Sequence, residues 1–283
     1  MTTQPYSEKL LPHPSESRIV ICGTARNIEH KIEKSIDTIS KAFCSFADVA
    51  MIICESHSDD GTRRKLETLQ SQYKNLIIVS DNSLAHAFRT VRIAAARNRL
   101  KAEVMKHFSN FHYVAMADLD GVNQDLTKRR VESCWRYQGW DVATANQPLR
   151  YYDIAALRAP NWAPGDSWQE FLTLKANLSH KKALKIAIKS KEKSISPKSN
   201  PIDVISAFGG LAIYRMSAFA QGSYHGLDKS GNETCEHVSF HQDLVNGGFK
   251  IKIIPSLVNL NRTTQVAGIL RSFLTSCKSL ILQ

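Results

Sequence analysis

Two carboxylates that stand one residue apart follow a short apolar run in this sequence. Asp118 and Asp120 come directly after residues 113–117, which read Tyr-Val-Ala-Met-Ala. Side chains two residues apart in a strand point to the same side, so both carboxylates can reach one cation at the strand end. Carboxylate oxygens bind hard divalent cations. The pair therefore predicts a metal site for a phosphorylated donor, and the alternative is a helix-capping aspartate beside a turn aspartate.

A second polar cluster follows the apolar residues 49–54. Residues 55–62 read Glu-Ser-His-Ser-Asp-Asp-Gly-Thr, and their acids could accept hydrogen bonds from the edge of a base or from ribose hydroxyls. The same residues suit a turn and the start of a helix equally well. We therefore assign only Glu55 and Asp60 of this cluster to binding.

Four arginines and no acid lie within residues 89–99. At 100° per residue, Arg89, Arg92 and Arg99 share one stripe of a helix, whereas Arg97 points elsewhere. The four therefore cannot all reach one ligand, and a solvated helix face accounts for two of them. Arg92, near the helix start, is the first candidate for a pyrophosphate, because a guanidinium group binds phosphate oxygens in pairs.

An acid and two histidines begin a predicted helix just after residues 222–231. Glu236, together with His237 or His241, could act as a general base or as a metal ligand. The two histidines are four residues apart and share one helix face, as zinc ligands would, but the sequence offers no obvious third ligand. The structural alternative is an N-terminal acid that is stabilised by the helix dipole.

Alternating strands and helices must bring these residues together. Apolar runs predict buried strands, and spaced apolar residues predict the helices between them. In a parallel sheet covered by helices on both faces, ligands bind at the carboxyl ends of the strands. Residues 24–27, 55–60 and 118–120 should therefore converge on one nucleotide-sized crevice. The predicted strands are 18–23, 49–54, 76–80, 113–117, 141–146, 206–215 and 249–258, and the main helices are 29–43, a helix through Leu66 and Leu69, and 87–107.

Composition and charge limit the classes of protein. The 283 residues carry a net charge of +11, which could serve nucleic acid, anionic lipid or a phosphorylated small molecule. Aromatic-interleaved basic motifs are missing from the sequence, which argues against nucleic acid. Residues 174–199 hold eight lysines and one glutamate, which suits either contact with an anionic membrane or a solvated loop. No run approaches a membrane helix, and the start does not resemble a signal peptide, so we expect a cytoplasmic protein, or one peripheral on the inner face of the membrane.

Together these motifs resemble the GT-A family of nucleotide-sugar glycosyltransferases. Residues 21–27 look like the family's first nucleotide strand, residues 55–62 like its Asp/Glu-x-Ser-x-Asp-Gly-Thr turn, and Asp118-Leu119-Asp120 matches its Asp-x-Asp motif. Residues 92–98 combined with 117–120 are most similar to the fungal capsule mannosyltransferase-like and Golgi mannan-polymerase-like branches. The likeness covers residues 18–125 well and the remainder thinly.

The resemblance implies an α/β fold with a Rossmann-type, mostly parallel sheet and a less regular acceptor-side C-terminal half. It also implies that Asp118 and Asp120 hold Mn²⁺ or Mg²⁺ on the diphosphate of a GDP- or UDP-sugar, from which a hexose moves to a glycan or lipid-linked glycan acceptor. Residues 208–215 look like the acceptor-side Gly-Gly segment, so Gly209, Gly210 and His237 are assigned to the acceptor. The donor-binding positions are Thr24, Arg26, Asn27, Glu55, Asp60, Arg92, Arg97 and Asp118.

Two departures from the family pattern bear on the chemistry. Glu236 is the candidate base if the enzyme inverts, yet it is followed by His237 where many relatives have an aspartate. Beyond the last predicted strand, Asn259-Leu260-Asn261 stands where some relatives place a metal-binding histidine. Stereochemistry, the third metal ligand and the oligomeric state therefore stay open.

The predicted organisation is an N-terminal extension (1–17), a nucleotide-sugar-binding half (18–125), an acceptor-binding half of the same domain (126–265) that contains the basic segment, and a C-terminal amphipathic helix (266–283). A nucleotidyltransferase is the alternative enzyme class, although residues 23–26 are too short for its usual glycine-rich phosphate loop. A non-enzymatic nucleic-acid-binding protein is the weaker alternative.

Overall fold

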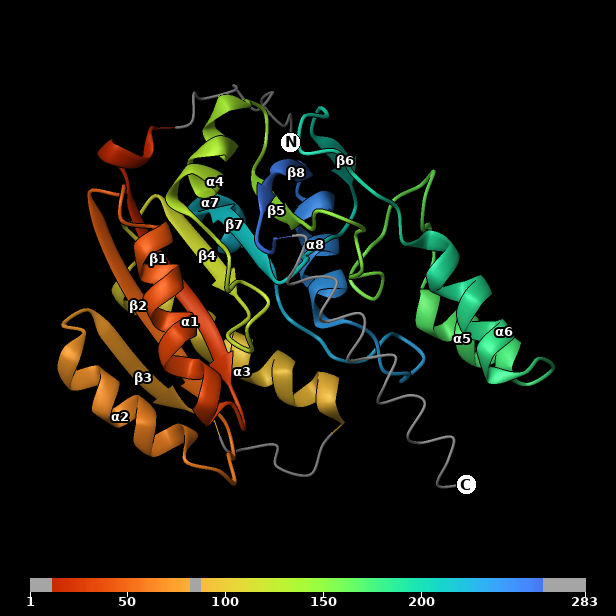
Figure 1. The fold of residues 1–283 in the computed structure, drawn as a ribbon, viewed down its shortest axis with the longest axis horizontal. Helices are drawn as coiled ribbons and strands as arrows, with labels where there is room; N and C mark the ends of the chain where they lie inside the picture. The colour runs from red at the N-terminus through yellow and green to blue at the C-terminus, as the bar shows by residue number, and fades with distance from the viewer. Residues whose placement is uncertain (1–11, 82–87, 262–283) are drawn as a thin grey trace, which may run out of the picture.

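A computed structural model describes residues 12–81 and 88–261 of the chain. An eight-stranded sheet with the order β3-β2-β1-β4-β7-β5-β8-β6 forms its centre (Figure 1). The strands are β1 (Arg18–Ala25), β2 (Asp48–Glu55), β3 (Leu76–Ser80), β4 (Tyr113–Ala117), β5 (Val142–Asn146), β6 (Ile202–Val204), β7 (Leu211–Arg215) and β8 (Ile251–Val258). The α-helices are α1 (Glu29–Ala42), α2 (Thr62–Gln72), α3 (Arg89–His107), α4 (Lys128–Glu132), α5 (Ser167–Lys175), α6 (His180–Ala187), α7 (Met216–Phe219) and α8 (Glu236–Asn246).

Six of the eight strands run in one direction. Strands β3, β2, β1 and β4 pair in parallel, and β5 pairs in parallel with β8. Only β7, between β4 and β5, and the edge strand β6 run the other way. The carboxyl ends of β1, β2 and β4 therefore meet at one edge of the sheet, where ligands bind in folds of this class.

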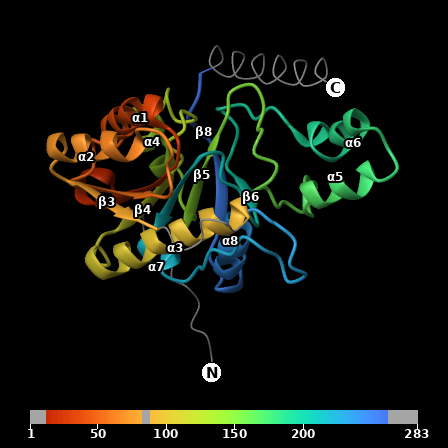
Figure 2. The same cartoon turned by 90° about the horizontal axis from the view of Figure 1, so that it is seen from below.

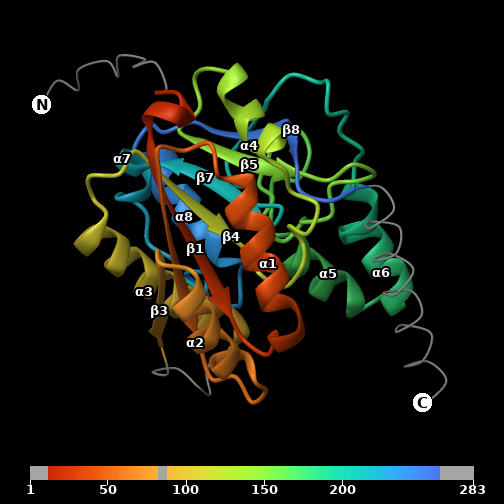
Figure 3. The same ribbon diagram turned by 60° about the vertical axis from the view of Figure 1, so that its left-hand side comes forward.

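Two apolar layers hold the helices on opposite faces of the sheet. Successive residues of a strand face opposite sides, so Ile19 and Ile21 of β1 belong to one buried cluster, and Val20 and Cys22 belong to the other. The first cluster includes the apolar residues of α1 and α2, and the second includes those of α3 and α8. Figure 2 shows α1 and α4 on one side of the sheet and α3, α7 and α8 on the other, and Figure 3 shows α1 lying along β1 and β4.

The predicted α/β architecture with a mostly parallel sheet is confirmed. One strand differs: only residues 211–215 of the predicted strand 206–215 are extended, and they run antiparallel. The preceding residues form a turn, because Gly209 and Gly210 have positive φ angles of 67° and 87°. The three-residue strand β6 was not predicted.

Residues 174–199, the basic segment, contain the end of α5 and the whole of α6. Helices α5 and α6 lie side by side and project from the body of the molecule (Figures 1 and 2). We refer to this pair as the α5–α6 hairpin. The predicted C-terminal helix at 266–283 lies outside the described residues. Among the helices that are described, none is both long and apolar enough to cross a membrane.

Candidate active site

A cleft of about 1200 Å³ opens at the carboxyl ends of β1 and β4, bordered by α3, α5 and the start of α8. Asp118 and Asp120 follow β4 directly, because the apolar run ends there, and both line the cleft. Of the predicted donor and acceptor residues, the structure brings into this cleft Thr24, Arg26, Asn27, Arg92, Arg97, Gly210, Glu236 and His237. Glu55, Asp60 and Gly209 do not line it.

Arg97 links three of the predicted site residues. Its guanidinium group is buried and forms an ion pair with Asp118 at 3.1 Å. The other terminal nitrogen contacts the Glu236 carboxylate and Nε2 of His237. The guanidinium carbon also lies 4.9 Å from the centre of the Phe208 ring. Arg97 does not lie on the helical stripe of the other arginines. Its side chain points into the centre of the site.

The remaining arginines of α3 divide between the cleft and solvent. Arg89 and Arg92 line the cleft, as members of one helical stripe should. Arg99 instead forms an ion pair at 2.7 Å with Glu103, one turn further along the same helix. Arg89 and Arg99 are both exposed, which agrees with the prediction that a solvated helix face accounts for two of the four arginines.

Burial sets the protonation of the acids and histidines in and below the site. It raises the pKa of Asp118 to about 7, against the opposing effect of Arg97. It lowers the pKa of His237 well below the usual value and that of His241 to about 3. Both histidines are therefore neutral near pH 7.

His241 is a core residue and not a zinc ligand in this structure. Its Nδ1 lies 3.0 Å from the Ser206 hydroxyl, and its Nε2 lies 2.9 Å from the Tyr214 hydroxyl. Both ring nitrogens are thus engaged. His237 stacks on Phe208 with ring centres 3.7 Å apart. The weaker alternative of a zinc pair has no support in these contacts.

The second acidic cluster builds a turn. Glu55 accepts a hydrogen bond from the Ser58 amide at 2.9 Å. Asp60 accepts hydrogen bonds from the backbone amides of Glu29 at 3.1 Å and Thr62 at 2.9 Å, and the Thr62 hydroxyl lowers its pKa further. Asp60 therefore connects the turn to the starts of α1 and α2, whereas Glu55 closes the turn on itself and pairs with Arg63 of α2 at 3.6 Å. From this cluster, Ser56 is the residue that lines the cleft.

A buried amide network, which the sequence did not reveal, fixes the backbone of Asp118. Asn123 donates to the Asp118 carbonyl and to the Gly210 carbonyl, both at 2.8 Å. Asn259 in turn donates to Asn123 Oδ1 at 2.9 Å and to the Gly209 carbonyl at 2.7 Å. Within the segment 259–261, Asn259 is thus a buried support beneath the Asp118 turn, whereas Asn261 is exposed and bonds the Asp125 carboxylate.

Asp153 is a further carboxylate in the cleft that the sequence did not single out. Its Oδ2 accepts a hydrogen bond from the Gly209 amide at 2.8 Å, and burial raises its pKa. It lies in the irregular connection 147–166, where no apolar periodicity or motif marks a site. The sequence marked Glu55, Asp118 and Asp120 because they follow predicted strands, whereas Asp153 does not follow a strand directly.

The donor atoms of the cleft fit a divalent metal that arrives with a diphosphate. Asp118 and Asp120 offer hard oxygen ligands of the kind that Mg²⁺ and Mn²⁺ prefer. One Asp118 oxygen is already paired with Arg97. Among residues 12–81 and 88–261, no group of three acids, histidines or cysteines is arranged to hold a metal alone. Diphosphate oxygens and water would therefore have to complete the coordination shell.

Comparison with known proteins supports the fold. No protein-family model and no curated relative matches this chain. A solved mannosyltransferase, PcManGT from Pyrobaculum calidifontis in complex with GDP-Man and Mn²⁺, is similar with a TM-score of 0.50 and 13% identity over 90% of this chain and 59% of that chain. S. aureus TarS 1–349 gives a TM-score of 0.46 and 12% identity over 83% of this chain and 57% of that chain.

This chain thus spans less than two thirds of either solved chain. At 13% identity the likeness to the mannosyltransferase concerns the fold alone. The comparisons do not favour the nucleotidyltransferase or nucleic-acid-binding alternatives. They leave the fungal capsule and mannan-polymerase branches unconfirmed. The fold of this chain is of the GT-A type.

Proposed function

We propose that this protein is a metal-dependent glycosyltransferase that moves a hexose from a GDP- or UDP-sugar to a glycan or lipid-linked glycan. One observation carries the proposal: Asp118 and Asp120 share a cleft at the strand ends of a GT-A-type fold with Arg92 and Arg97. Two carboxylates suit a divalent ion, and two guanidinium groups suit the diphosphate that the ion neutralises.

The donor would lie across the end of β1. Thr24, Arg26 and Asn27 would contact the nucleoside, and Arg92 and Arg97 the diphosphate. Glu55 and Asp60 would act through the turn that they hold in place. Bound Mn²⁺ or Mg²⁺ on Asp118 and Asp120 would offset the charge that develops on the leaving diphosphate.

Glu236 is the proposed base of an inverting reaction. Its carboxylate would take the proton of an acceptor hydroxyl whose oxygen attacks the anomeric carbon, while the bond from that carbon to the diphosphate oxygen breaks. Gly209, Gly210 and His237 would border the acceptor. In the present structure Arg97 pairs with both Glu236 and Asp118. Metal binding at Asp118 would compete with Arg97 for that carboxylate and so would change the pairing of Glu236.

A thermal-shift screen tests the donor class. GDP, UDP and CMP are each added to the full chain with Mn²⁺ and, separately, with EDTA. We expect one nucleoside diphosphate to raise the melting temperature only when Mn²⁺ is present, because ligand that binds only the folded state stabilises it. Equal shifts with EDTA would contradict metal dependence, and the absence of any shift at millimolar nucleotide would contradict the donor proposal.

Peripheral contact with an anionic membrane through the basic segment forms part of the proposal. Lys181, Lys182 and Lys185 are exposed on α6, and lysines near an anionic surface each add to membrane affinity. Vesicles that contain phosphatidylserine should bind the protein at low salt, and replacement of the three lysines by glutamine should abolish binding. The same change at the exposed Lys31, Lys34 and Lys74 is the matched control. Equal loss in both triple variants would indicate a nonspecific charge effect and contradict the assignment.

A further inference from the structure

The exposed lining of the cleft includes large apolar side chains beside its charged and polar residues. Within the described residues, seven large apolar side chains are well exposed, and four of them line this cleft. These four are Phe88 (60% exposed), Leu172 (55%), Trp168 (45%) and Tyr152 (41%). Scattered single apolar residues are normal on a protein surface, whereas several gathered in one concave region indicate a binding site. We refer to these four residues as the apolar mouth.

The local sequence holds one side of the apolar mouth in place. Asp166 caps α5 by accepting hydrogen bonds from the amides of Trp168 at 2.9 Å and Gln169 at 3.2 Å. The same carboxylate pairs with Arg158 at 2.5 Å, which fixes the helix start to the body of the molecule. Phe171 is buried and contacts the Trp168 ring edge to face, with ring centres 5.6 Å apart. Trp168 and Leu172, four residues apart, therefore share the helix face next to the cleft.

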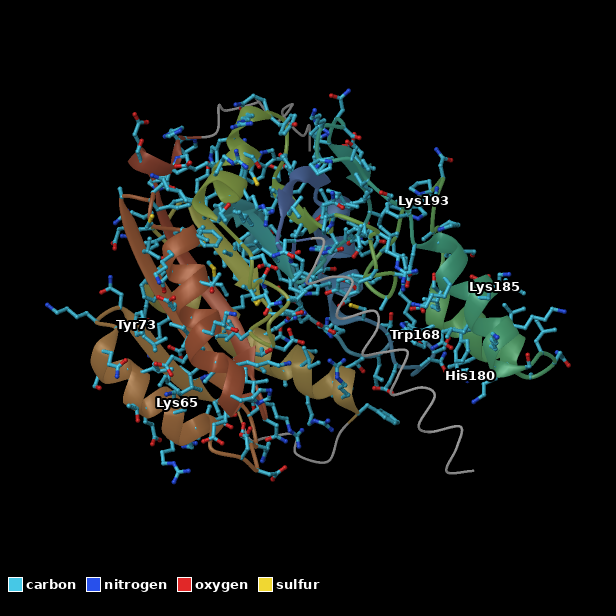
Figure 4. The ribbon with its side chains drawn as sticks, in the orientation of Figure 1. Lys65, Tyr73, Trp168, His180, Lys185 and Lys193 are labelled. Atoms are coloured by element: carbon cyan, nitrogen blue, oxygen red, sulfur yellow. The ribbon has the colours of Figure 1, made fainter. Side chains whose placement is uncertain are left out.

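The other parts of the apolar mouth come from different segments. Phe88 precedes α3, whose Thr90 hydroxyl lies 2.9 Å from the carboxylate of Glu233 in the segment before α8. Tyr152 lies beside Asp153 in the connection after β5. Figure 4 shows Trp168 on the side of the α5–α6 hairpin that is nearer the body of the molecule, whereas Lys185 and His180 lie further out on α6. The α5–α6 hairpin thus presents apolar side chains to the cleft and lysines outward.

We infer that the apolar mouth binds the hydrophobic part of an amphiphilic acceptor, such as the alkyl or lipid portion of a glycoside. This inference rests on the proposed function. The mouth is continuous with the floor that holds Asp118 and Glu236, so an apolar tail seated there leaves a hydroxyl-bearing head group near the reacting centre. A free sugar can stack on one aromatic ring, but four apolar side chains from three segments suit a longer chain.

The charges around the hairpin agree with this occupant. Lys175, Lys181, Lys182 and Lys185 are exposed on α5 and α6 and do not line the cleft, so an anionic membrane surface next to the cleft would meet positive charge. An apolar tail with an anionic neighbour is the chemistry of a lipid-linked acceptor at a membrane surface.

Calorimetric titration of the full chain with methyl, hexyl and octyl α-mannoside, below the micelle concentration and with GDP and Mn²⁺ present, tests the inference. Each buried methylene contributes about 0.8 kcal/mol, so the octyl compound, with two more methylenes, should bind about 15-fold more tightly than the hexyl compound. Trp168→Ala and Leu172→Ala should reduce this dependence on chain length, and Trp168→Phe should keep most of it. Melting temperatures verify that each variant is folded.

Ile186→Ala is the matched control, because Ile186 is 41% exposed on the same hairpin but does not line the cleft. It should bind the series as the unmodified protein does. Equal affinity for methyl and octyl mannoside, or the same loss in Ile186→Ala as in Trp168→Ala, would overturn the inference. Nucleotide binding, measured separately in the unmodified protein, distinguishes the two proposals: octyl mannoside binding without any Mn²⁺-dependent nucleotide binding would refute the donor proposal and leave the apolar site standing.

Discussion

At the scale of single residues, Arg97 is the centre of the site. One buried guanidinium group pairs with Asp118, which follows β4, and with Glu236 at the start of α8, although β4 and α8 are far apart in the sequence. The sequence predicted correctly that Arg97 leaves the stripe of Arg92, but helical geometry alone could not say what it faces. That information depends on how α3 and α8 pack against the sheet, which a periodicity does not contain.

Arg97→Ala should destabilise the protein strongly. It would leave the buried Glu236 carboxylate without its cation, and removal of one partner from a buried ion pair costs about 3–5 kcal/mol. Arg99→Ala, two residues further along, removes an ion pair on the surface of the same helix and should cost about 0.5 kcal/mol. Urea unfolding measures both. A similar small loss in the two variants would mean that Arg97 does not neutralise a buried charge.

The neutral buried histidines predict a loss of stability in acid. Because burial depresses the folded-state pKa of His241 to about 3, the unfolded chain binds a proton below about pH 6.5 that the folded chain does not bind. The unfolding free energy should therefore fall by about 2 kcal/mol for this residue between about pH 7 and pH 5.

Urea unfolding of His241→Gln at the two pH values checks this origin. The glutamine cannot titrate, so the drop in unfolding free energy should be smaller by about that amount. His180→Gln, which removes an exposed histidine on α6, should leave the drop unchanged. An equal drop in His241→Gln and the unmodified protein would contradict the assignment.

At the scale of elements, the site depends on strand ends and on the turn 206–210. Alternation of apolar strands with helices predicted β1 to β4, and with them the position of Asp118 and Asp120. The support beneath Asp118 could not be predicted, because it joins Asn123 to Asn259 and the turn through buried side-chain hydrogen bonds. Asparagine and glycine at those positions carry no periodic signal. The edge strand β6 has three residues and is too short to show an alternating apolar pattern.

Asn259→Ala tests that support. It should leave Asn123 Oδ1 buried without its donor, at a cost of about 1–3 kcal/mol, and should remove one of the two side-chain donors to the Gly209 carbonyl, the other being Gln147. Displacement of the Asp118 turn should also weaken Mn²⁺ binding, as measured by electron paramagnetic resonance of free Mn²⁺ in the presence of nucleotide.

Asn246→Ala, which removes an exposed asparagine whose side chain accepts a hydrogen bond from Gln242, provides the comparison. Its Mn²⁺ affinity should equal that of the unmodified protein. An Asn259→Ala protein that is destabilised but binds Mn²⁺ with unchanged affinity would show that Asn259 has a structural role only.

At the scale of the whole molecule, the cleft lies where the regular first half meets the irregular second half. The first half contributes the β1 and β4 ends, Phe88 and the arginines of α3, and the second contributes Glu236, Asp153 and the other three residues of the apolar mouth. The sequence predicted the contribution of the first half in outline, since strand ends have a recognisable pattern. Trp168 and Tyr152, which line the cleft opposite those strand ends, come from α5 and from the connection after β5. Only the folded chain determines the positions of these two segments.

Binding of a nucleoside diphosphate with Mn²⁺ tests the central claim most directly. Isothermal titration calorimetry compares the unmodified protein with Asp120→Asn and with Asp203→Asn, which changes an exposed aspartate that pairs with Lys252 away from the cleft. Mn²⁺-dependent affinity for GDP or UDP should fall at least tenfold in Asp120→Asn and stay unchanged in Asp203→Asn. Equal affinity in Asp120→Asn and the unmodified protein would contradict the metal site on which the proposed function rests.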